Sequence, residues 1–212
     1  MLVARASQAA SATQAPAAAG VTPQSYLPLI TAPEATATPT ATVTPTTMPG
    51  TTPTCIVRPA VTEGPYFVDE QLNRSDIRSD PGTGTIKPGA LLALTFNVSK
   101  IAGGSCTALS GATVDVWHCD AAGLYSDESA NNSVGQKFLR GYQVTDANGL
   151  AAFTTIYPGW YSGRDVHIHF KIRTTTSSGA SYEFTSQLFF DDTLTDQVFT
   201  QAPYASRARG TS

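Results

Sequence analysis

Apolar and polar residues alternate along much of the chain after residue 90. The alternation is clear in LLALTFNVS and ATVDVWHCD, and it recurs in FLRGYQV, LAAFTTIY, VHIHFKI and SYEFTSQLFF. A period of two residues is typical of half-buried strands. We therefore predict strands at 91–99, 112–120, 138–144, 150–157, 166–172 and 181–190.

Turn-forming sequences separate these strands, and no stretch keeps an apolar period of 3.6 residues. DANG (146–149) and SSG (177–179) contain the residue types that favour tight turns. Short strands with turns at this spacing predict an all-β domain, as an antiparallel β-sandwich or barrel.

The first quarter of the chain has a different composition. Residues 1–54 hold 13 Thr, 13 Ala and 8 of the 14 Pro, but only two charged side chains, Arg5 and Glu34. Few large apolar groups are present to offset the entropy of ordering, and closely spaced prolines favour extended backbone. We predict a disordered linker or stalk over 1–54 and one domain over 55–212.

Charge and hydropathy remove several functional classes. The formal charge of −3 offers no basic surface for nucleic acid. No apolar run approaches the roughly 20 residues of a membrane span, and MLVARASQAA lacks the apolar region of a secretory signal. We expect no nucleic-acid partner and no transmembrane segment.

The segment VHIHFK carries the clearest chemical signal. On a strand, His167 and His169 project from one face, while Ile168 and Phe170 project from the other into a core. Two imidazoles on one face form half of a metal site. An isolated H-x-H pair more often lies on a solvated face, here beside Lys171, so that alternative stays open.

Two further segments place polar groups beside predicted strands. YPGWYSGR sets Tyr161 and Arg164 just before the strand with the two histidines, and Tyr125 follows a turn at Gly123. On spacing alone, a packing aromatic explains Tyr161, and a surface cation explains Arg164, at least as well as a functional role does. For Tyr125, a packing aromatic is the better explanation on spacing alone. His118, beside Trp117, fits a hydrogen-bonded core histidine better than a metal ligand.

The three cysteines allow at most one internal disulfide. We expect Cys119 to be buried, or disulfide-linked to Cys55 or Cys106.

Four stretches together resemble the intradiol ring-cleavage dioxygenases, the catechol and protocatechuate 3,4-dioxygenase family. They are TEGPYF (62–67), LSGATVDVWHCDAAGLYS (109–126), FLRGYQVTDANGLAAFTTIYPGWYSGRDVHIHFK (138–171) and TSQLFF (185–190). The chain is most similar to the short, single-domain, exported members. The resemblance implies the antiparallel β-sandwich of that family.

The resemblance also implies a non-haem Fe(III) ion bound by Tyr125, Tyr161, His167 and His169. Hard phenolate oxygens suit a ferric ion, and the cation keeps a bound phenol deprotonated. The implied reaction is cleavage of an aromatic diol by O2 to a cis,cis-muconate-type dicarboxylate. Tyr161 would be the displaced ligand that takes a substrate proton.

Further site residues follow from the same resemblance. Arg164 would stabilise negative charge on the ring as O2 attacks, and Gln187 would help to orient the site. A segment that closes over the substrate would contain Thr62, Gly64, Pro65 and Tyr66.

Both ends of the chain depart from the family pattern. The helical N-terminal domain of dimeric relatives is replaced by the spacer over 1–54, so we expect another form of homo-oligomer or none. The spacer favours an extracellular or cell-surface protein. Relatives normally continue past QAPYASR into further strands. We therefore expect either that the domain over 55–212 is C-terminally incomplete or that its sandwich has an exposed edge.

A different class of function remains as the alternative. Transthyretin-like, surface-displayed β-sandwich modules share patterns such as GATVDVW without being enzymes. The two hypotheses differ in that only the enzyme requires a particular set of five residues together, which a binding module does not need. These residues are Tyr125, Tyr161, Arg164, His167 and His169.

Overall fold

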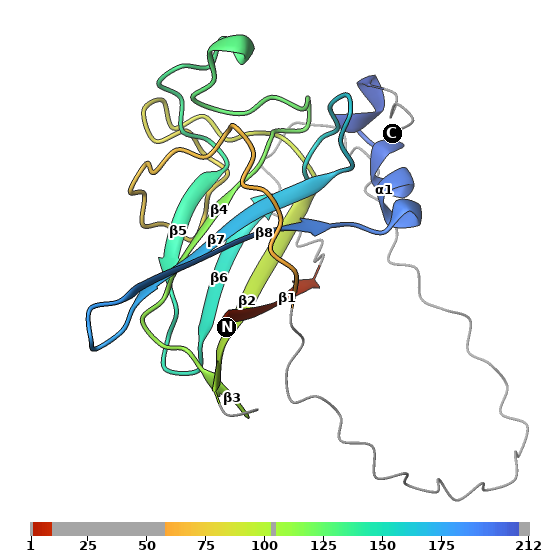
Figure 1. Cartoon of the computed structure of the whole chain (residues 1–212). Helices are drawn as coiled ribbons and strands as arrows, with labels where there is room; N and C mark the ends of the chain where they lie inside the picture. Colours follow the sequence, from red (N-terminus) through yellow and green to blue (C-terminus); the bar gives the residue numbers. More distant parts are fainter. Residues whose placement is uncertain (1, 10–57, 103–104, 208–212) are drawn as a thin grey trace, which may run out of the picture. The chain divides into compact units, whose positions relative to one another are not determined.

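The computed structural model describes residues 2–9, 58–102 and 105–207. All six predicted strands are present (Figure 1): β2 (Leu91–Ala102), β4 (Thr113–Trp117), β5 (Arg140–Val144), β6 (Leu150–Ile156), β7 (His167–Thr175) and β8 (Ser181–Phe189). Elements that we did not predict are β1 (Leu2–Ala9), β3 (Ser105–Ala108), the helix α1 (Asp192–Phe199) and 3-10 turns at Ser129–Asn131 and Tyr204–Ser206.

The strands form two four-stranded antiparallel sheets. The β7 sheet has the order β5-β4-β7-β8. In the β2 sheet, β1 lies along one edge of β2, while β6 and β3 pair with successive parts of the other edge. The sequence predicted either a sandwich or a barrel, and the structure is an antiparallel β-sandwich.

The core lies between the two sheets and follows from the alternation of each strand. The β2 strand buries every second residue from Leu92 to Val98, and β7 contributes Ile168, Phe170 and Ile172. Facing apolar side chains from both sheets interdigitate: the rings of Phe96 in β2 and Phe170 in β7 pack with 5.1 Å between their centroids.

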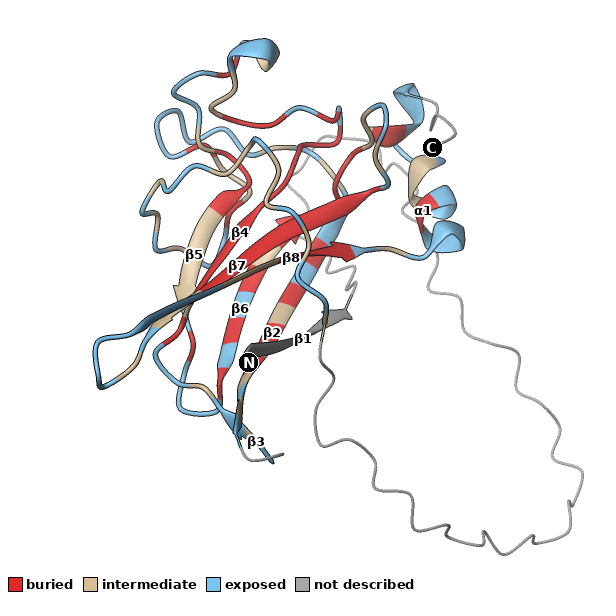
Figure 2. Ribbon diagram, in the orientation of Figure 1, coloured by how far each residue is buried: buried red, intermediate tan, exposed pale blue. Residues whose placement is uncertain are grey.

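The opposite face of β7 carries His167 and His169, as the alternation predicts. In register, His169 lies opposite Trp117 of β4 and Gln187 of β8, and His167 lies opposite Phe189. This outer face is also covered: Figure 2 shows β7 buried along most of its length, and Lys171 is only 5% exposed. The alternative of a solvated histidine pair is wrong.

The N-terminal spacer lies largely outside the described residues, so the linker and the domain start at residue 55 stay predictions. Within its first residues, β1 pairs with β2, from Leu2 opposite Lys100 to Ala9 opposite Ala93. No helix in the described part of the chain is long and apolar enough to span a membrane.

Candidate metal centre and active site

The two β7 histidines aim their Nε2 atoms at each other. His167 Nε2 lies 2.9 Å from His169 Nε2. The other ring nitrogen of His167, Nδ1, lies 2.5 Å from the carbonyl oxygen of Asp165, an acceptor, so Nδ1 carries the proton. His167 Nε2 therefore has a free lone pair directed into the site.

Two loops bring tyrosine hydroxyls to the same point. Tyr161 Oη lies 3.1 Å from His167 Nε2, and Tyr125 Oη lies 3.5 Å from it. The two hydroxyl oxygens are 3.4 Å apart. Four donor atoms from β7 and two loops therefore surround one point.

Two glycines let the backbones of these loops approach each other. A Cβ at Gly123 would clash with the carbonyl oxygen of Trp160, and one at Gly159 would clash with the carbonyl oxygen of Asp120. Gly123 also has φ +78°, which disfavours other residues. Close loop packing explains why Tyr125 and Tyr161 meet although 36 residues separate them.

This cluster fits a metal ion better than a set of hydrogen bonds. A neutral imidazole nitrogen offers one lone pair, yet three polar atoms, from Tyr125, Tyr161 and His169, crowd His167 Nε2. Atoms that share a metal at about 2.1 Å lie about 3 Å apart, close to the separations found here.

The protonation of the four groups is governed by burial. Burial lowers the pKa of His169 to about 2 and also lowers the pKa of His167, so both rings are neutral at pH 7. Burial raises the pKa of the phenols of Tyr125 and Tyr161. A cation among these four atoms would reverse the effect on the phenols, because it stabilises phenolate.

Carboxylates do not supply an alternative metal site here. Among the described residues, no group of three or more His, Cys, Asp or Glu side chains is placed to hold a metal. A metal at this centre would depend on the oxygens of Tyr125 and Tyr161 together with the two histidines. Two imidazoles with two phenolates suit a hard, highly charged ion.

A polar chain flanks the centre on the β8 side. Arg164 donates from Nη2 to Gln187 Oε1 at 2.5 Å, and Gln187 Nε2 donates to the carbonyl oxygen of Thr62 at 2.8 Å. None of the ion pairs among the described residues involves Arg164. Its charge is therefore oriented by an amide and left available to the site.

Residues 62–67, which we call the strap, cross the outer face of the β7 sheet. Gly64 lies against the ring of His169, and Tyr66 stacks on Tyr125 with 4.4 Å between ring centroids. Thr62 and Pro65 are exposed. The structure thus brings Thr62, Gly64 and Tyr66 to the centre, while the described contacts do not tie the Pro65 side chain to it.

The sequence analysis missed two residues that support the centre. The indole of Trp117 stacks on His169, with 5.0 Å between centroids and 11° between planes. Arg140, 2% exposed, donates to the carbonyl oxygens of Ser126 and Tyr66. Only the strand pairing places Trp117 beside His169, so no single-segment pattern could have revealed it.

His118 and the cysteines follow the expectations in part. His118 is fully buried, with Nε2 2.7 Å from Thr155 Oγ1, and is a core histidine. Cys119 is buried, as one of the two alternatives predicted, and it is free, so the alternative of a disulfide is wrong. Burial raises the pKa of its thiol to about 12. Cys106 is disulfide-bonded, and Cys55 lies outside the described residues.

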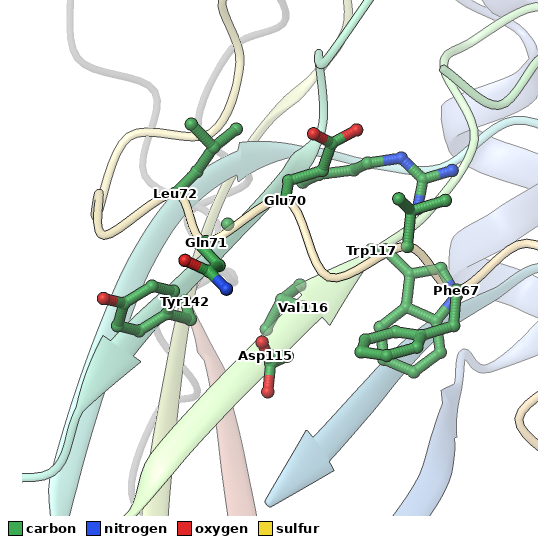
Figure 3. A pocket seen from close by; sticks show the side chains of 11 residues that line it. Phe67, Glu70, Gln71, Leu72, Asp115, Val116, Trp117 and Tyr142 are labelled. Atoms are coloured by element: carbon green, nitrogen blue, oxygen red, sulfur yellow. The ribbon is translucent and has the colours of Figure 1, made fainter. Parts of the chain in front are cut away.

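A small pocket lies between residues 67–72 and strands β4 and β5 (Figure 3). Phe67, Glu70, Asp115, Trp117 and Tyr142 are among the residues that line it. None of the four converging donors lines this pocket. It is therefore distinct from the candidate metal centre.

Comparison with known proteins places this arrangement in a family. The family model described as "Dioxygenase" matches residues 62–210, which contain the strap and all four donors. The chain belongs to the intradiol ring-cleavage dioxygenase family.

Two relatives illustrate the extent of the family match. An intradiol ring-cleavage dioxygenase from Tetranychus urticae superposes with a TM-score of 0.59 and 31% identity, covering 74% of this chain and 76% of that one. A chlorocatechol 1,2-dioxygenase of Pseudomonas putida is 29% identical over 133 residues, which are 54% of this chain and 48% of that protein. The chain spans about half the length of this curated relative.

Proposed function

We propose that this family member catalyses Fe(III)-dependent intradiol cleavage of a catechol by O2, giving a cis,cis-muconate-type dicarboxylate. The observation that carries the proposal is the convergence of Tyr125, Tyr161, His167 and His169 on one point, with His167 Nε2 unprotonated and directed inward. A non-enzymatic binding module gives no reason for this convergence, so that alternative is not favoured.

These four side chains would hold the ferric ion. When bound, the ion would accept both catechol oxygens and make the aromatic ring susceptible to O2. Tyr161 is partly exposed whereas Tyr125 is 1% exposed. The phenol oxygen of Tyr161 is therefore the better placed of the two to leave and take a proton from a catechol hydroxyl.

The chain's other site residues would orient the substrate and stabilise charge. Arg164, held by Gln187, supplies a fixed positive charge for the ring as negative charge develops on it. The strap covers the centre through Gly64 and Tyr66 and limits the access of water to it.

The charges around the site favour a catechol without a carboxylate substituent. Arg140 is engaged by backbone carbonyls, and Lys171 forms ion pairs with Glu63 and Glu183. Neither cation is left to pair with a substrate carboxylate. Catechol, hydroxyquinol or lignin-derived diols are therefore preferred over protocatechuate in this proposal.

Export to an oxidising compartment is part of the same proposal. The disulfide of Cys106 supports it, because such bonds persist mainly outside the cytosol.

The test is ring cleavage by the ferric-loaded full chain. We expect a visible tyrosinate-to-iron charge-transfer band and oxygen uptake with catechol.

Tyr161→Phe should shift the band and lower kcat by at least about 100-fold, because it removes a metal ligand and a proton acceptor together. Tyr182→Phe is the control, since Tyr182 lies exposed on β8. Wild-type oxygen uptake in Tyr161→Phe would refute the ligand assignment, and a colourless ferric-loaded protein would refute the metal centre.

A further inference from the structure

Lys171 is a buried cation on the same strand face as the two histidines. His167, His169 and Lys171 follow each other at two-residue intervals on β7, and all three are at most 5% exposed. A buried ammonium needs partners that replace water. The partners of Lys171 therefore indicate what covers this face.

Its two carboxylate partners come from different parts of the chain. Glu183 lies on the neighbouring strand β8, and its Oε1 is 2.9 Å from Lys171 Nζ. Glu63 lies in the strap and forms the second ion pair of Lys171. Lys171 Nζ also lies 4.0 Å from the centroid of the Phe67 ring, so it contacts the strap at both ends.

Glu63 differs in kind from the hydrogen-bonded attachments of the strap. Gln187 and Arg140 hold the strap through the carbonyl oxygens of Thr62 and Tyr66, which any sequence would offer. Glu63 is the only charged side chain in TEGPYF. Attachment through Lys171 is therefore a specific property of this sequence.

The attachment bears directly on the candidate centre. Glu63 stands between Thr62, which accepts from the amide that orients Arg164, and Gly64, which contacts the His169 ring. A strap released at Glu63 would uncover His169 and loosen the substrate-facing side of the centre.

We propose that Lys171 is a positioning residue that clamps the strap over the metal centre through Glu63. The inference rests on the proposed function only for its catalytic consequence, because the position of the strap can be measured without turnover. The clamp lowers the cost of substrate binding by holding the cover in its bound position. It leaves the chemistry to the four ligands and Arg164.

Glu63→Gln and Glu183→Gln form a matched pair for the test, because both carboxylates bond the same Nζ but only Glu63 belongs to the strap. In Glu63→Gln, we expect hydrogen exchange of the amides of residues 61–67 to rise about tenfold, as local opening becomes easier. We expect KM for catechol to rise about three- to tenfold and kcat to change less than twofold, since pre-organisation is lost and the ligands are kept. Glu183→Gln should change neither quantity appreciably.

The two readouts separate failure of the clamp from failure of the proposed function. Strap exchange that is unchanged in Glu63→Gln, or raised equally in both variants, would overturn the clamp. A protein that does not cleave catechol would refute the proposed function, while the exchange measurement would still decide the clamp.

Discussion

Arg140 contacts both segments that enclose Tyr125. Its guanidinium donates to the hydroxyl and the carbonyl of Ser126, which follows Tyr125 in the chain, at 2.8 and 2.7 Å. It also donates to the carbonyl of Tyr66, whose ring stacks on Tyr125, at 2.6 Å. One buried side chain therefore fixes the backbone beside Tyr125 and the ring that covers it.

Replacement of Arg140 should alter the centre itself. We expect Arg140→Met to shift the visible band of the ferric protein and to lower its iron affinity about 10- to 100-fold, as is usual when a group that orients a metal ligand is lost. The measurement is a ferric titration followed by absorbance.

Arg74 provides the control, because it is a second part-buried arginine that donates to backbone carbonyls, those of Arg140, Lys137 and Ser79. Arg74→Met should destabilise the fold without moving the band. Equal band shifts in the two variants would show that Arg140 acts only through general stability.

At the residue scale, the site residues that could be predicted are those that belong to a recognisable pattern of residues close by in the sequence. The two-residue spacing of His167 and His169 predicts one shared face, and the structure has them on one face. Arg140 and Lys171 could not be assigned in this way. The partners of Arg140 are backbone carbonyls, and those of Lys171 lie on separate segments, so neither leaves a local pattern.

At the scale of elements, turn glycines differ in what surrounds them. These surroundings decide how much an alanine substitution lowers the free energy of unfolding. Gly149, in the DANG turn, has φ +77°, and a Cβ there would clash with the carbonyl oxygen of Val98. Gly179, between β7 and β8, has φ +82°, but nothing lies within 4 Å of a Cβ there. Both positions disfavour Ala, and only Gly149 adds a collision with β2.

Alanine substitution should therefore separate conformational strain from packing. We expect Gly179→Ala to lower the free energy of unfolding by about 1–2 kcal/mol, the cost of a left-handed conformation. Gly149→Ala should cost more, about 3 kcal/mol or above, because the backbone of β2 must also shift. Urea unfolding of both variants measures the difference, and equal losses would contradict the steric argument.

The six central strands could be predicted because each alternates over its own length. The helix α1 could not, since eight residues give only about two turns of period. Its start is fixed instead by Asp191, whose side chain accepts from the Leu194 amide at 3.1 Å. The pairing of β1 with β2 joins residues about 90 positions apart, and a single sequence does not reveal such distant partners.

The DANG turn also shows what a local sequence pattern can predict and what it cannot. The turn forms as predicted, with Asp146 accepting from the Asn148 and Leu150 amides at 2.8 Å. It joins β5 of one sheet to β6 of the other, rather than two paired strands. Turn chemistry therefore specifies a reversal of the chain, while the buried faces decide which sheet each strand enters.

At the scale of the whole molecule, the proposed metal centre joins three segments that only the folded chain brings together. Tyr125 follows β4, Tyr161 follows β6, and the two histidines begin β7. An ion that binds this arrangement and not the unfolded chain must stabilise the fold.

Iron removal should therefore lower the melting temperature. At a free ferric concentration of 100 times Kd, linkage adds about 2.7 kcal/mol. For a domain of this size that corresponds to a rise in Tm of about 5–10 °C. Calorimetry of the ferric-loaded and chelated protein measures the shift, and His167→Ala should abolish it.

The added stability should be concentrated in the two tyrosine loops, with hydrogen exchange there rising on chelation while the amides of β2 and β6 stay protected. A shift of equal size in His167→Ala would mean that iron stabilises the chain from another site, and the four converging donors would then not be the metal centre.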